Sequence, residues 1–310
     1  MFELKYSADR RTVVYMIITT SLLILQWNLS SIIYPVYILS LFMAISVAVI
    51  AHNHNHVPMW KSRPMNIFTD YWLTVFYGFP AFGWIPTHNR NHHNLNNKEG
   101  DFTITYRLSE KNNLLTLLSY PSMSSYFQQK PIRDYLKLLY KSNKTNFYFA
   151  AFQYVALALL YIGGLILDWK KTLLFIVIPH QVALFSILIF NYLQHVHADE
   201  ESDIDHSRNF TGFLNTLLFN NGYHTIHHKR ANLHWSLTPA EHHKIENMID
   251  PALNEKSFWR FIVRTYFAAI FVPRLGTVSK RLQRIEAKKN QAATTIPSTN
   301  EQRTTSVHSM

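Results

Sequence analysis

Four blocks of apolar residues dominate the pattern of hydrophobic and polar positions along the chain. The first two, TVVYMIITTSLLILQW (12–27) and IIYPVYILSLFMAISVAVIA (32–51), are separated by the short polar segment NLSS. The second two, FYFAAFQYVALALLYIGGLIL (147–167) and LLFIVIPHQVALFSILIFNYL (173–193), are separated by DWKKT. A helix needs about 20 apolar residues to cross the roughly 30 Å hydrocarbon core of a bilayer. The pattern therefore predicts two transmembrane hairpins, although any single block is also compatible with a buried helix of a soluble protein.

A fifth apolar stretch lies between the two hairpins, at residues 66–86. Glycine and proline interrupt it four times, and both disfavour a continuous helix; they stand at Gly78, Pro80, Gly83 and Pro86. We therefore expect this stretch to lie at the membrane interface or to re-enter the membrane without crossing it.

We predict interfacial helices at 113–140, 210–221 and 256–271. In the last of these, KSFWRFIVRTYFAAIF, aromatic and basic residues are interleaved, as they are in helices that lie flat at a membrane surface. After about residue 275 the apolar periodicity is lost and the chain becomes charged, which is typical of disorder. The sequence thus predicts a membrane domain at 1–274 and a disordered basic tail at 275–310.

The distribution of Lys and Arg orients the predicted hairpins. Of the 30 Lys and Arg residues, 28 lie before residue 12, in 52–146 or after 194, and only two lie in the turns of the hairpins. Lys and Arg accumulate on the cytoplasmic side of membrane proteins. The predicted fold is an all-α integral membrane protein, with four transmembrane helices in two hairpins and a cytosolic helical cap. Both termini are predicted to be cytoplasmic.

Composition narrows the chemistry that is available to the chain. There is no cysteine, which excludes disulfides, thiolate catalysis and cysteine-ligated iron–sulfur clusters. The formal net charge of +11 favours anionic partners such as lipid head groups and acidic proteins. No nucleic-acid recognition motif accompanies this charge, so we expect no nucleic-acid partner.

Histidine is concentrated in three clusters, all on the predicted cytoplasmic face: HNHNH (52–56), HNRNHH (88–93) and HTIHH (224–228). Residues three and four apart share one face of an α-helix. This spacing predicts that His52 faces the same way as His56, His88 the same way as His92, and His224 the same way as both His227 and His228. Neutral imidazole is the commonest protein ligand for transition metals.

A fourth element, NYLQH, places Asn191 four residues before His195 at the end of the last apolar block. Nine histidines then form the candidate set of metal ligands, more than the four that one structural zinc ion takes. Two metal ions, each bound by four or five imidazole nitrogens, would account for the nine histidines. The set consists of His52, His56, His88, His92, His93, His195, His224, His227 and His228.

The other histidines are assigned differently. His54 lies two residues from both His52 and His56, so on a helix it points away from them and is expected to support the site rather than to bind metal. His180 lies inside a predicted span and is expected to make a buried polar contact. The remaining six are assigned to the surface: His197, His206, His234, His242, His243 and His308.

The order and spacing of these elements resemble the membrane fatty acid desaturase family of histidine-box di-iron enzymes. The matching segments are HNHNH, HNRNHH, NYLQH and NGYHTIHH, which together cover residues 40–240. The chain departs from the family in the additional His54, and in the stretch KRANLHW, which lacks a proline that many members have there. The resemblance implies a four-span bundle under a cytosolic cap and two irons held by the nine histidines. It also implies that Asn191 reaches one metal through water.

The resemblance implies O2-dependent desaturation of a fatty acyl chain in an apolar tunnel, with no catalytic residue beyond the metal ligands. An unactivated methylene offers neither an acidic proton nor a leaving group, so an iron–oxygen oxidant is required. Two electrons must come from a separate ferredoxin or cytochrome b5-type donor, because the sequence contains no cytochrome domain and no cysteine. The acyl group is expected on CoA, a carrier protein or a lipid. Arg90 and Lys61 are candidates for contacting the substrate head group.

Several alternatives remain open at this point. The same scaffold supports hydroxylation, acetylenation, carotenoid ketolation or decarboxylation to a terminal alkene. A histidine-rich metal transporter is the non-enzymatic alternative, although transporters place their ligands near the middle of the membrane. A bis-histidine haem protein is disfavoured because only His180 lies well within a span. The compact chain favours a bacterial inner membrane over the endoplasmic reticulum.

Overall fold

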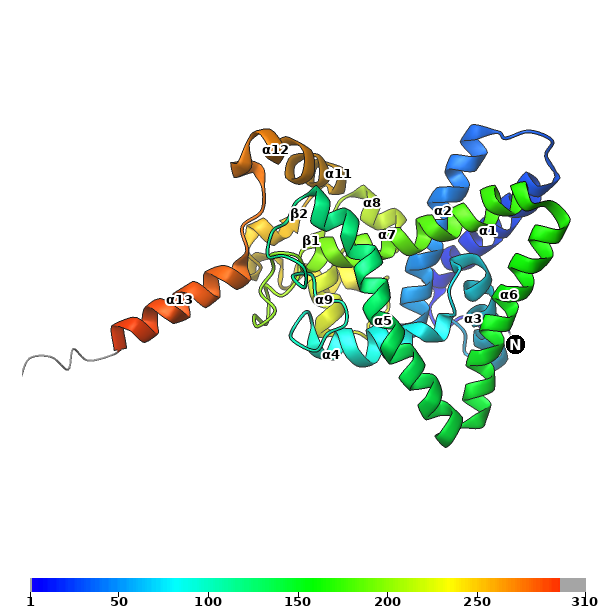
Figure 1. Ribbon diagram of the computed structural model, residues 1–310, viewed down its shortest axis with the longest axis horizontal. Coiled ribbons are helices and arrows are strands. Elements are labelled where there is room, and N and C mark those ends of the chain that lie inside the picture. Colours follow the sequence, from blue (N-terminus) through cyan, green and yellow to red (C-terminus); the bar gives the residue numbers. More distant parts are fainter. Residues whose placement is uncertain (1, 296–310) are drawn as a thin grey trace, which may run out of the picture.

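The computed structural model describes residues 2–295 and is built almost entirely from helices (Figure 1). Six α-helices of 15 residues or more lie before residue 200: α1 (Arg10–Asn28), α2 (Tyr34–His56), α3 (Arg63–Tyr77), α5 (Leu114–Ser142), α6 (Lys144–Thr172) and α7 (Ile178–His195). The short α-helices are α4 (His93–Leu95), α8 (Phe213–Leu217), α9 (His224–Lys229), α10 (Thr238–His243), α11 (Phe258–Ile262) and α12 (Ala269–Phe271). The last described helix is α13 (Lys280–Thr295).

Three π-helical segments and two very short strands complete the architecture. The π-helices are η3 (Ile85–His92), η4 (Leu173–Val177) and η7 (Val263–Ala268). Strands β1 (Asn209–Phe210) and β2 (Asn254–Glu255) pair in parallel, with Asn209 opposite Asn254. The 3₁₀ segments are η1 (Ser7–Asp9), η2 (Ala81–Gly83), η5 (Glu246–Met248), η6 (Pro251–Leu253) and η8 (Pro273–Leu275).

Two helical stretches are long and apolar enough to cross a membrane, namely Tyr34–His56 and Lys144–His195. The second contains α6, η4 and α7, and its backbone leaves the helical region at Asp168, where φ is −161° and ψ is 100°. The Asp168 side chain accepts hydrogen bonds from the backbone N–H groups of Lys170 and Lys171, which is the bonding of a helix N-cap. In Figure 1, α6 and α7 accordingly form two arms that meet at a corner.

Helix α2 is buried between α1 and α7 and is the centre of the largest apolar core. Its buried face contains small side chains, including Ala44, Ser46, Ala48 and Ala51, all 3% exposed or less. Small residues let neighbouring helix backbones approach closely. This packing fixes the end of α2 at His52 and His56 relative to the end of α7 at His195.

The apolar stretch at 66–86 is not a continuous helix, which confirms the prediction from its glycines and prolines. Helix α3 ends at Gly78, which has a left-handed φ of 80°. A Cβ atom at this position would lie 2.5 Å from the Cβ of His180. Glycine is therefore required here both by the backbone conformation and by the close approach of α7.

The predicted interfacial segments are helical to different extents. Helix α5 covers the predicted segment 113–140, and α11, η7 and α12 form one uninterrupted helical stretch within 256–271. Only α8 is helical within 210–221; the rest forms turns around Gly222, where a Cβ would lie 2.2 Å from the carbonyl oxygen of Phe210.

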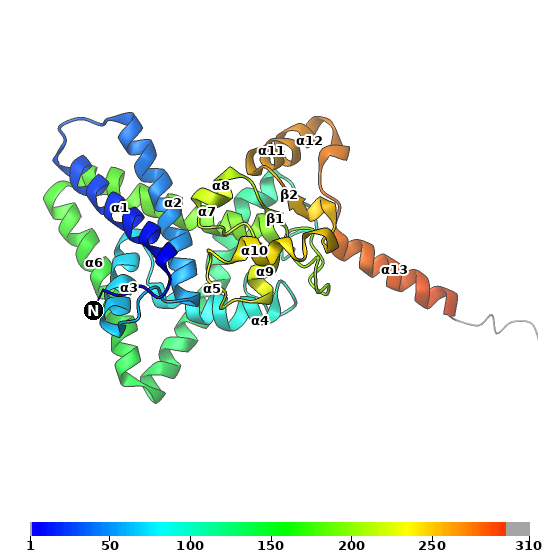
Figure 2. The same ribbon diagram turned by 180° about the vertical axis from the view of Figure 1, so that it is seen from behind.

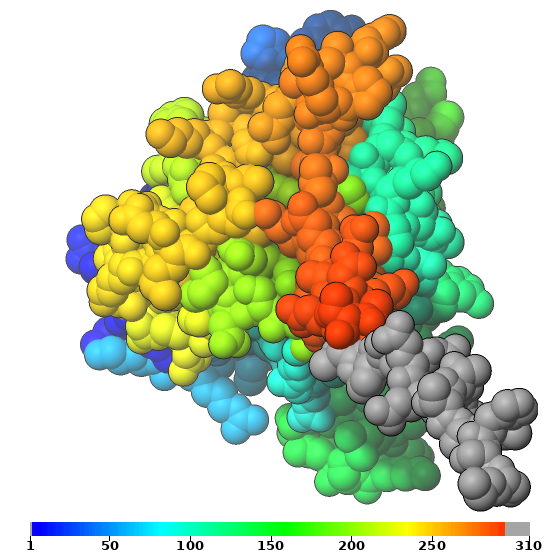
Figure 3. Space-filling view, turned by 90° about the vertical axis from the view of Figure 1, so that its left-hand side faces the viewer, coloured from blue at the N-terminus to red at the C-terminus, as the bar shows by residue number. Residues whose placement is uncertain are grey.

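The prediction of disorder after residue 275 is wrong for the part of the tail that the structure describes, because α13 spans Lys280–Thr295. Arg284 bonds to Asp199 at 2.6 Å and to Glu200 at 2.7 Å, and Arg281 bonds to Glu110 at 2.9 Å. These ion pairs hold the first turns of α13 against the protein. The helix then projects from the body of the molecule (Figure 1) and stands in front of it in Figure 3. Residues 296–310 lie outside the described residues, and the division into domains 1–274 and 275–310 stays a prediction.

We expect the substitution Gly78→Ala to lower the thermal stability of the protein in detergent. The left-handed conformation alone costs a non-glycine residue about 1–2 kcal/mol, and the contact with His180 adds to this cost. Gly163→Ala is the matched control, because Gly163 lies within α6 with nothing within 4 Å of an added Cβ. Equal melting temperatures for the two variants would contradict the role assigned to Gly78.

Candidate metal centre

Nine buried or half-buried histidines gather into two adjacent groups. The first group contains His52, His56, His88, His93 and His227, and the second contains His92, His195, His224 and His228. Within each group, the nitrogen atoms that could bind a metal lie within 4.8 Å of one another. These are the nine histidines that the sequence places in the candidate set.

Five helical elements carry these histidine side chains. Helices α2 and α7 contribute their last turns, η3 and α4 contribute the second cluster, and α9 contributes the third. Helix α9 packs against β1 and α10, and Figure 2 shows these elements together on the far side of the molecule. Histidines separated by up to 176 positions in the sequence therefore meet at one place.

The pairing of histidines differs from the pairing expected for regular α-helices. His88 lies in the π-helix η3, whose hydrogen bonds join residues five apart. The Nε2 atoms of His88 and His93 are accordingly 3.1 Å apart, whereas His92 joins the second group. His88 and His92 do face the same way, with their rings stacked and the centroids 5.2 Å apart, but they belong to different groups.

The third cluster is also divided between the two groups. His224 and His228 both belong to the second group, and their Nε2 atoms are 3.1 Å apart. Their spacing of four residues predicts this shared direction. His227 instead faces the first group, with its Nε2 atom 2.9 Å from that of His52. Helix α9 therefore contributes to both groups from its two sides.

The distances between nitrogen atoms fit a shared metal ion. Facing Nε2 atoms are 2.9 Å apart in the pairs His52–His227 and His195–His224. Two nitrogens about 2.1 Å from one ion are about 3.0 Å apart at a right angle and about 3.4 Å apart at the tetrahedral angle. The observed separations are short enough for both nitrogens of each pair to bind one ion.

Several buried nitrogen atoms in the groups have no hydrogen-bond partner among the described residues. These include Nε2 of His56 and Nε2 of His92. Buried polar atoms in folded proteins almost always have a partner. A metal ion in each group would satisfy these lone pairs, so the residues present fit a pair of metal ions.

A second layer of hydrogen bonds orients two of the imidazoles. His92 Nδ1 lies 2.8 Å from Asp101 Oδ2 and 2.9 Å from Thr103 Oγ1, and His52 Nδ1 lies 2.9 Å from Asn221 Oδ1. A hydrogen bond at Nδ1 leaves Nε2 as the atom that can bind metal. Sequence reasoning missed Asp101, Thr103 and Asn221, because no regular spacing links them to the histidines they contact.

Burial keeps the imidazoles in the neutral form that binds metal. It lowers the pKa of His88 well below the usual value, and the positive charge that neighbouring histidines would carry lowers it further. The pKa values of His93, His224, His227 and His228 shift in the same direction for the same reasons. For Asp101, burial alone would raise the pKa, but His92 and the hydrogen bonds from His92 and Thr103 bring it below its ordinary value. Asp101 is therefore a carboxylate.

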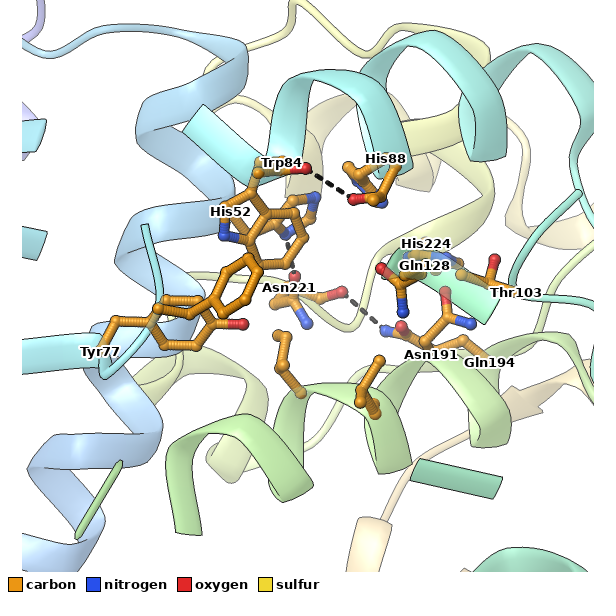
Figure 4. A pocket seen from close by; sticks show the side chains of 15 residues that line it. His52, Tyr77, Trp84, His88, Thr103, Gln128, Asn191, Gln194, Asn221 and His224 are labelled. Atoms are coloured by element: carbon orange, nitrogen blue, oxygen red, sulfur yellow. Dashed lines mark hydrogen bonds between the residues drawn. The ribbon is translucent and has the colours of Figure 1, made fainter. Parts of the chain in front are cut away.

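A cavity of about 80 Å³ adjoins both groups of histidines (Figure 4). His52 and His88 of the first group and His224 of the second line it. Its remaining wall is apolar on one side, with Tyr77, Phe79, Trp84, Ile187 and Leu188, and polar on the other, with Thr103, Gln128, Asn191, Gln194 and Asn221. The cavity therefore offers an apolar surface immediately beside the candidate metal ligands.

Three further residues of the predicted site have separate positions. Asn191 lines the cavity and donates a hydrogen bond from Nδ2 to the Tyr120 hydroxyl at 2.6 Å. Lys61 pairs with Glu3 on the surface, and the exposed Arg90 lies over the ring of Tyr135 at 5.0 Å. Neither Lys61 nor Arg90 lines the cavity, and their contact with a head group stays a prediction.

The remaining histidines lie outside the two groups. His54 accepts a hydrogen bond from the backbone N–H of Met59, and His180 bonds to the Tyr161 hydroxyl at 2.7 Å, as expected for a non-ligand and a buried polar contact. The assignment to the surface is wrong for three histidines, because neighbouring residues bury them to 4% exposure or less. They are His206, His234 and His242. His197 is half-buried, His243 is exposed, and His308 lies outside the described residues.

Taken together, apolar helices of membrane-spanning length and two buried histidine groups define a class of helical protein with a candidate binuclear metal centre. The family model for fatty acid desaturases matches residues 29–260, three-quarters of the chain, and the chain belongs to this family. The family places the protein among oxidoreductases that act on fatty acids. No curated protein and no solved structure matches the chain.

We expect Asp101→Asn to weaken metal binding, because the amide is a poorer acceptor and no longer fixes the ring of His92. Loss of such a supporting hydrogen bond typically reduces metal affinity about 10–100-fold. The affinity for ferrous iron can be measured by competition with a chelator. Asp134→Asn, which removes an exposed partner of Lys130, is the control. An unchanged iron affinity in Asp101→Asn would show that the contact does not support a ligand.

Proposed function

We propose that the protein catalyses O2-dependent desaturation of a fatty acyl chain at a centre of two irons. The observation that carries the proposal is the convergence of nine imidazoles into groups of five and four beside an apolar cavity, in a member of the fatty acid desaturase family. The reaction removes two hydrogens from neighbouring methylenes, and with two electrons and two protons O2 becomes two molecules of water.

Two bound irons would supply the oxidising power that no amino-acid side chain has toward an unactivated methylene. The first histidine group would hold one iron, and the second would hold the other. Asn191 would reach the second iron through water. The Nδ2 atom of Asn191 already donates a hydrogen bond to the Tyr120 hydroxyl. Its Oδ1 atom is therefore the one that would accept a hydrogen bond from that water.

The protein's own contribution to the reaction is to position the substrate and to exclude solvent. Trp84 stacks on the ring of His52 with the centroids 5.2 Å apart, which places an apolar surface directly against the first group. Tyr77 and Ile187, both nearly fully buried, form the adjoining wall. We propose that this wall holds the acyl chain with the methylenes to be oxidised facing the histidine groups.

We further propose that four helical spans cross the membrane: α1, α2, α6, and η4 together with α7. The break at Asp168 supports counting α6 and α7 separately. Large apolar side chains face outward on α1 and α6, among them Ile17, Ile24, Leu159 and Ile166, each at least 59% exposed. Contiguous exposed apolar surface of this kind is typical of contact with lipid.

The topology and partners follow from this arrangement. With 28 of 30 Lys and Arg outside the hairpin turns, we place both termini and the histidine groups on the cytoplasmic side. We further propose a bacterial inner membrane rather than the endoplasmic reticulum as the location. An external ferredoxin or cytochrome b5-type protein would supply the electrons. The basic cytoplasmic face would attract such an acidic donor.

Product analysis tests the reaction. The purified protein with iron, an electron donor and O2 is supplied with a deuterium-labelled acyl substrate, and the products are analysed by mass spectrometry. We expect an alkene that has lost two hydrogens from adjacent carbons. A hydroxylated product without an alkene, or a terminal alkene with loss of the carboxyl carbon, would overturn desaturation in favour of another reaction of this scaffold.

Metal analysis tests the centre itself. We expect about two irons per chain, with His88→Ala and His224→Ala each lowering the content, because each removes a nitrogen ligand from a different group. His243→Ala is the control, since this side chain is 81% exposed and pairs with Glu246. Loosely held, exchangeable zinc without O2-dependent turnover would instead favour a metal transporter.

A further inference from the structure

A second and larger cavity, of about 310 Å³, lies between α7, β1, α8 and α11. Its wall is mainly apolar and includes Phe190, Phe210, Leu214, Leu217 and Phe258. Cavities of this size with an apolar wall commonly hold small ligands. This cavity is separate from the one that the histidines line, and the reaction proposed above does not use it.

The two cavities share a wall made by Gln194 and Asn221, which line both. Gln194 Nε2 donates a hydrogen bond to the backbone carbonyl of Asn221 at 2.9 Å, and Asn221 Oδ1 lies 2.9 Å from Nδ1 of His52. Because of these two hydrogen bonds, the polar groups of Gln194 and Asn221 that form the wall already have partners within the protein. An occupant of the second cavity would therefore contact Gln194 and Asn221, and Asn221 in turn contacts His52.

The entrance of the second cavity is both aromatic and basic. Phe213 and Trp259 line the cavity and are 77% and 64% exposed. Lys256 also lines it, and neither this residue nor the exposed Arg260 forms an ion pair with any described residue. Glu255, the acidic residue of β2 that precedes Lys256, is already paired with Arg264 at 2.6 Å.

The helical stretch beside the entrance has the character of an interfacial helix. Beyond Trp259 it exposes Val263, Phe267, Ile270 and Phe271, each at least 50% exposed. Aromatic and basic residues interleaved along a helix favour a position at the level of lipid head groups. In Figures 1 and 2, α11 and α12 lie beside α8 along one edge of the molecule.

We propose that the second cavity binds one acyl tail of an anionic bilayer phospholipid, with its phosphate held by Lys256 and Arg260. The apolar wall can pack against the acyl tail, and the two cationic side chains, which have no ion-pair partner among the described residues, can bind the phosphate. The proposal rests on the membrane placement given under the proposed function, but not on the reaction. It assigns a lipid site behind the wall that orients His52.

Photo-crosslinking tests the site. The full-length, iron-loaded protein is reconstituted with phosphatidylglycerol that carries a diazirine near the middle of one tail, and the labelled peptides are mapped by mass spectrometry. We expect labels on the segments 210–218 and 256–259. Leu214→Trp, which fills the cavity, should reduce this labelling about tenfold, equivalent to about 1.4 kcal/mol of binding. Leu237→Trp, at an exposed position outside the cavity, should leave it unchanged.

A charge reversal provides a second variant in case Leu214→Trp fails to fold. Lys256→Glu should reduce labelling by phosphatidylglycerol relative to the same diazirine phosphatidylcholine, whereas Lys288→Glu on the exposed surface of α13 should not. Labels confined to α1 and α6, or labelling that neither cavity variant changes, would overturn the lipid site. Equal labelling by both lipids would overturn the assignment of Lys256 and Arg260.

The outcomes for the lipid site and for the reaction are independent. Desaturation without labels in the second cavity would overturn the lipid site and leave the proposed function intact. Labels in the cavity of a protein that forms no alkene would support the lipid site and count against the reaction alone.

Discussion

The structure depends on the mutual approach of nine imidazoles in a buried space. Nitrogen atoms that face one another at 2.9–3.1 Å cannot all be satisfied by one another, and Nε2 of His56 and of His92 have no partner among the described residues. Leaving such groups buried and unpaired is unfavourable. A metal ion in each group would resolve this conflict, and it would link the histidines of α2, η3, α7 and α9.

The helices around the centre serve to hold these imidazoles in place. Small residues on α2 let α1 and α7 pack closely, and this fixes the ends that carry His52 and His195. The π-helix η3 divides the second cluster between the two groups, which a regular α-helix would not do. The buried Asp101 then orients His92, so the arrangement is fixed both by the backbone and by side-chain hydrogen bonds. One apolar cavity lies in front of this centre and a second lies behind the wall formed by Gln194 and Asn221.

The sequence predicts the helical architecture and all members of the histidine set, because apolar blocks and clustered imidazoles leave periodic signals. It does not predict how His88, His92 and His93 are paired, since a π-helix leaves no distinct periodicity in eight residues. It also misses Asp101, which a loop brings back to His92 nine residues earlier, and Asn221, which contacts His52 from 169 positions away. Helix α13 is missed for a related reason: its first turns are ordered by ion pairs with Asp199 and Glu200, which local composition does not reveal.

The central claim is that the two histidine groups each hold one iron. Anomalous diffraction at the iron absorption edge, from crystals of the iron-loaded protein, tests this most directly. We expect two anomalous peaks, one among the five imidazoles that include His88 and one among the four that include His195. A single peak shared by all nine residues, or iron bound elsewhere on the chain, would contradict it.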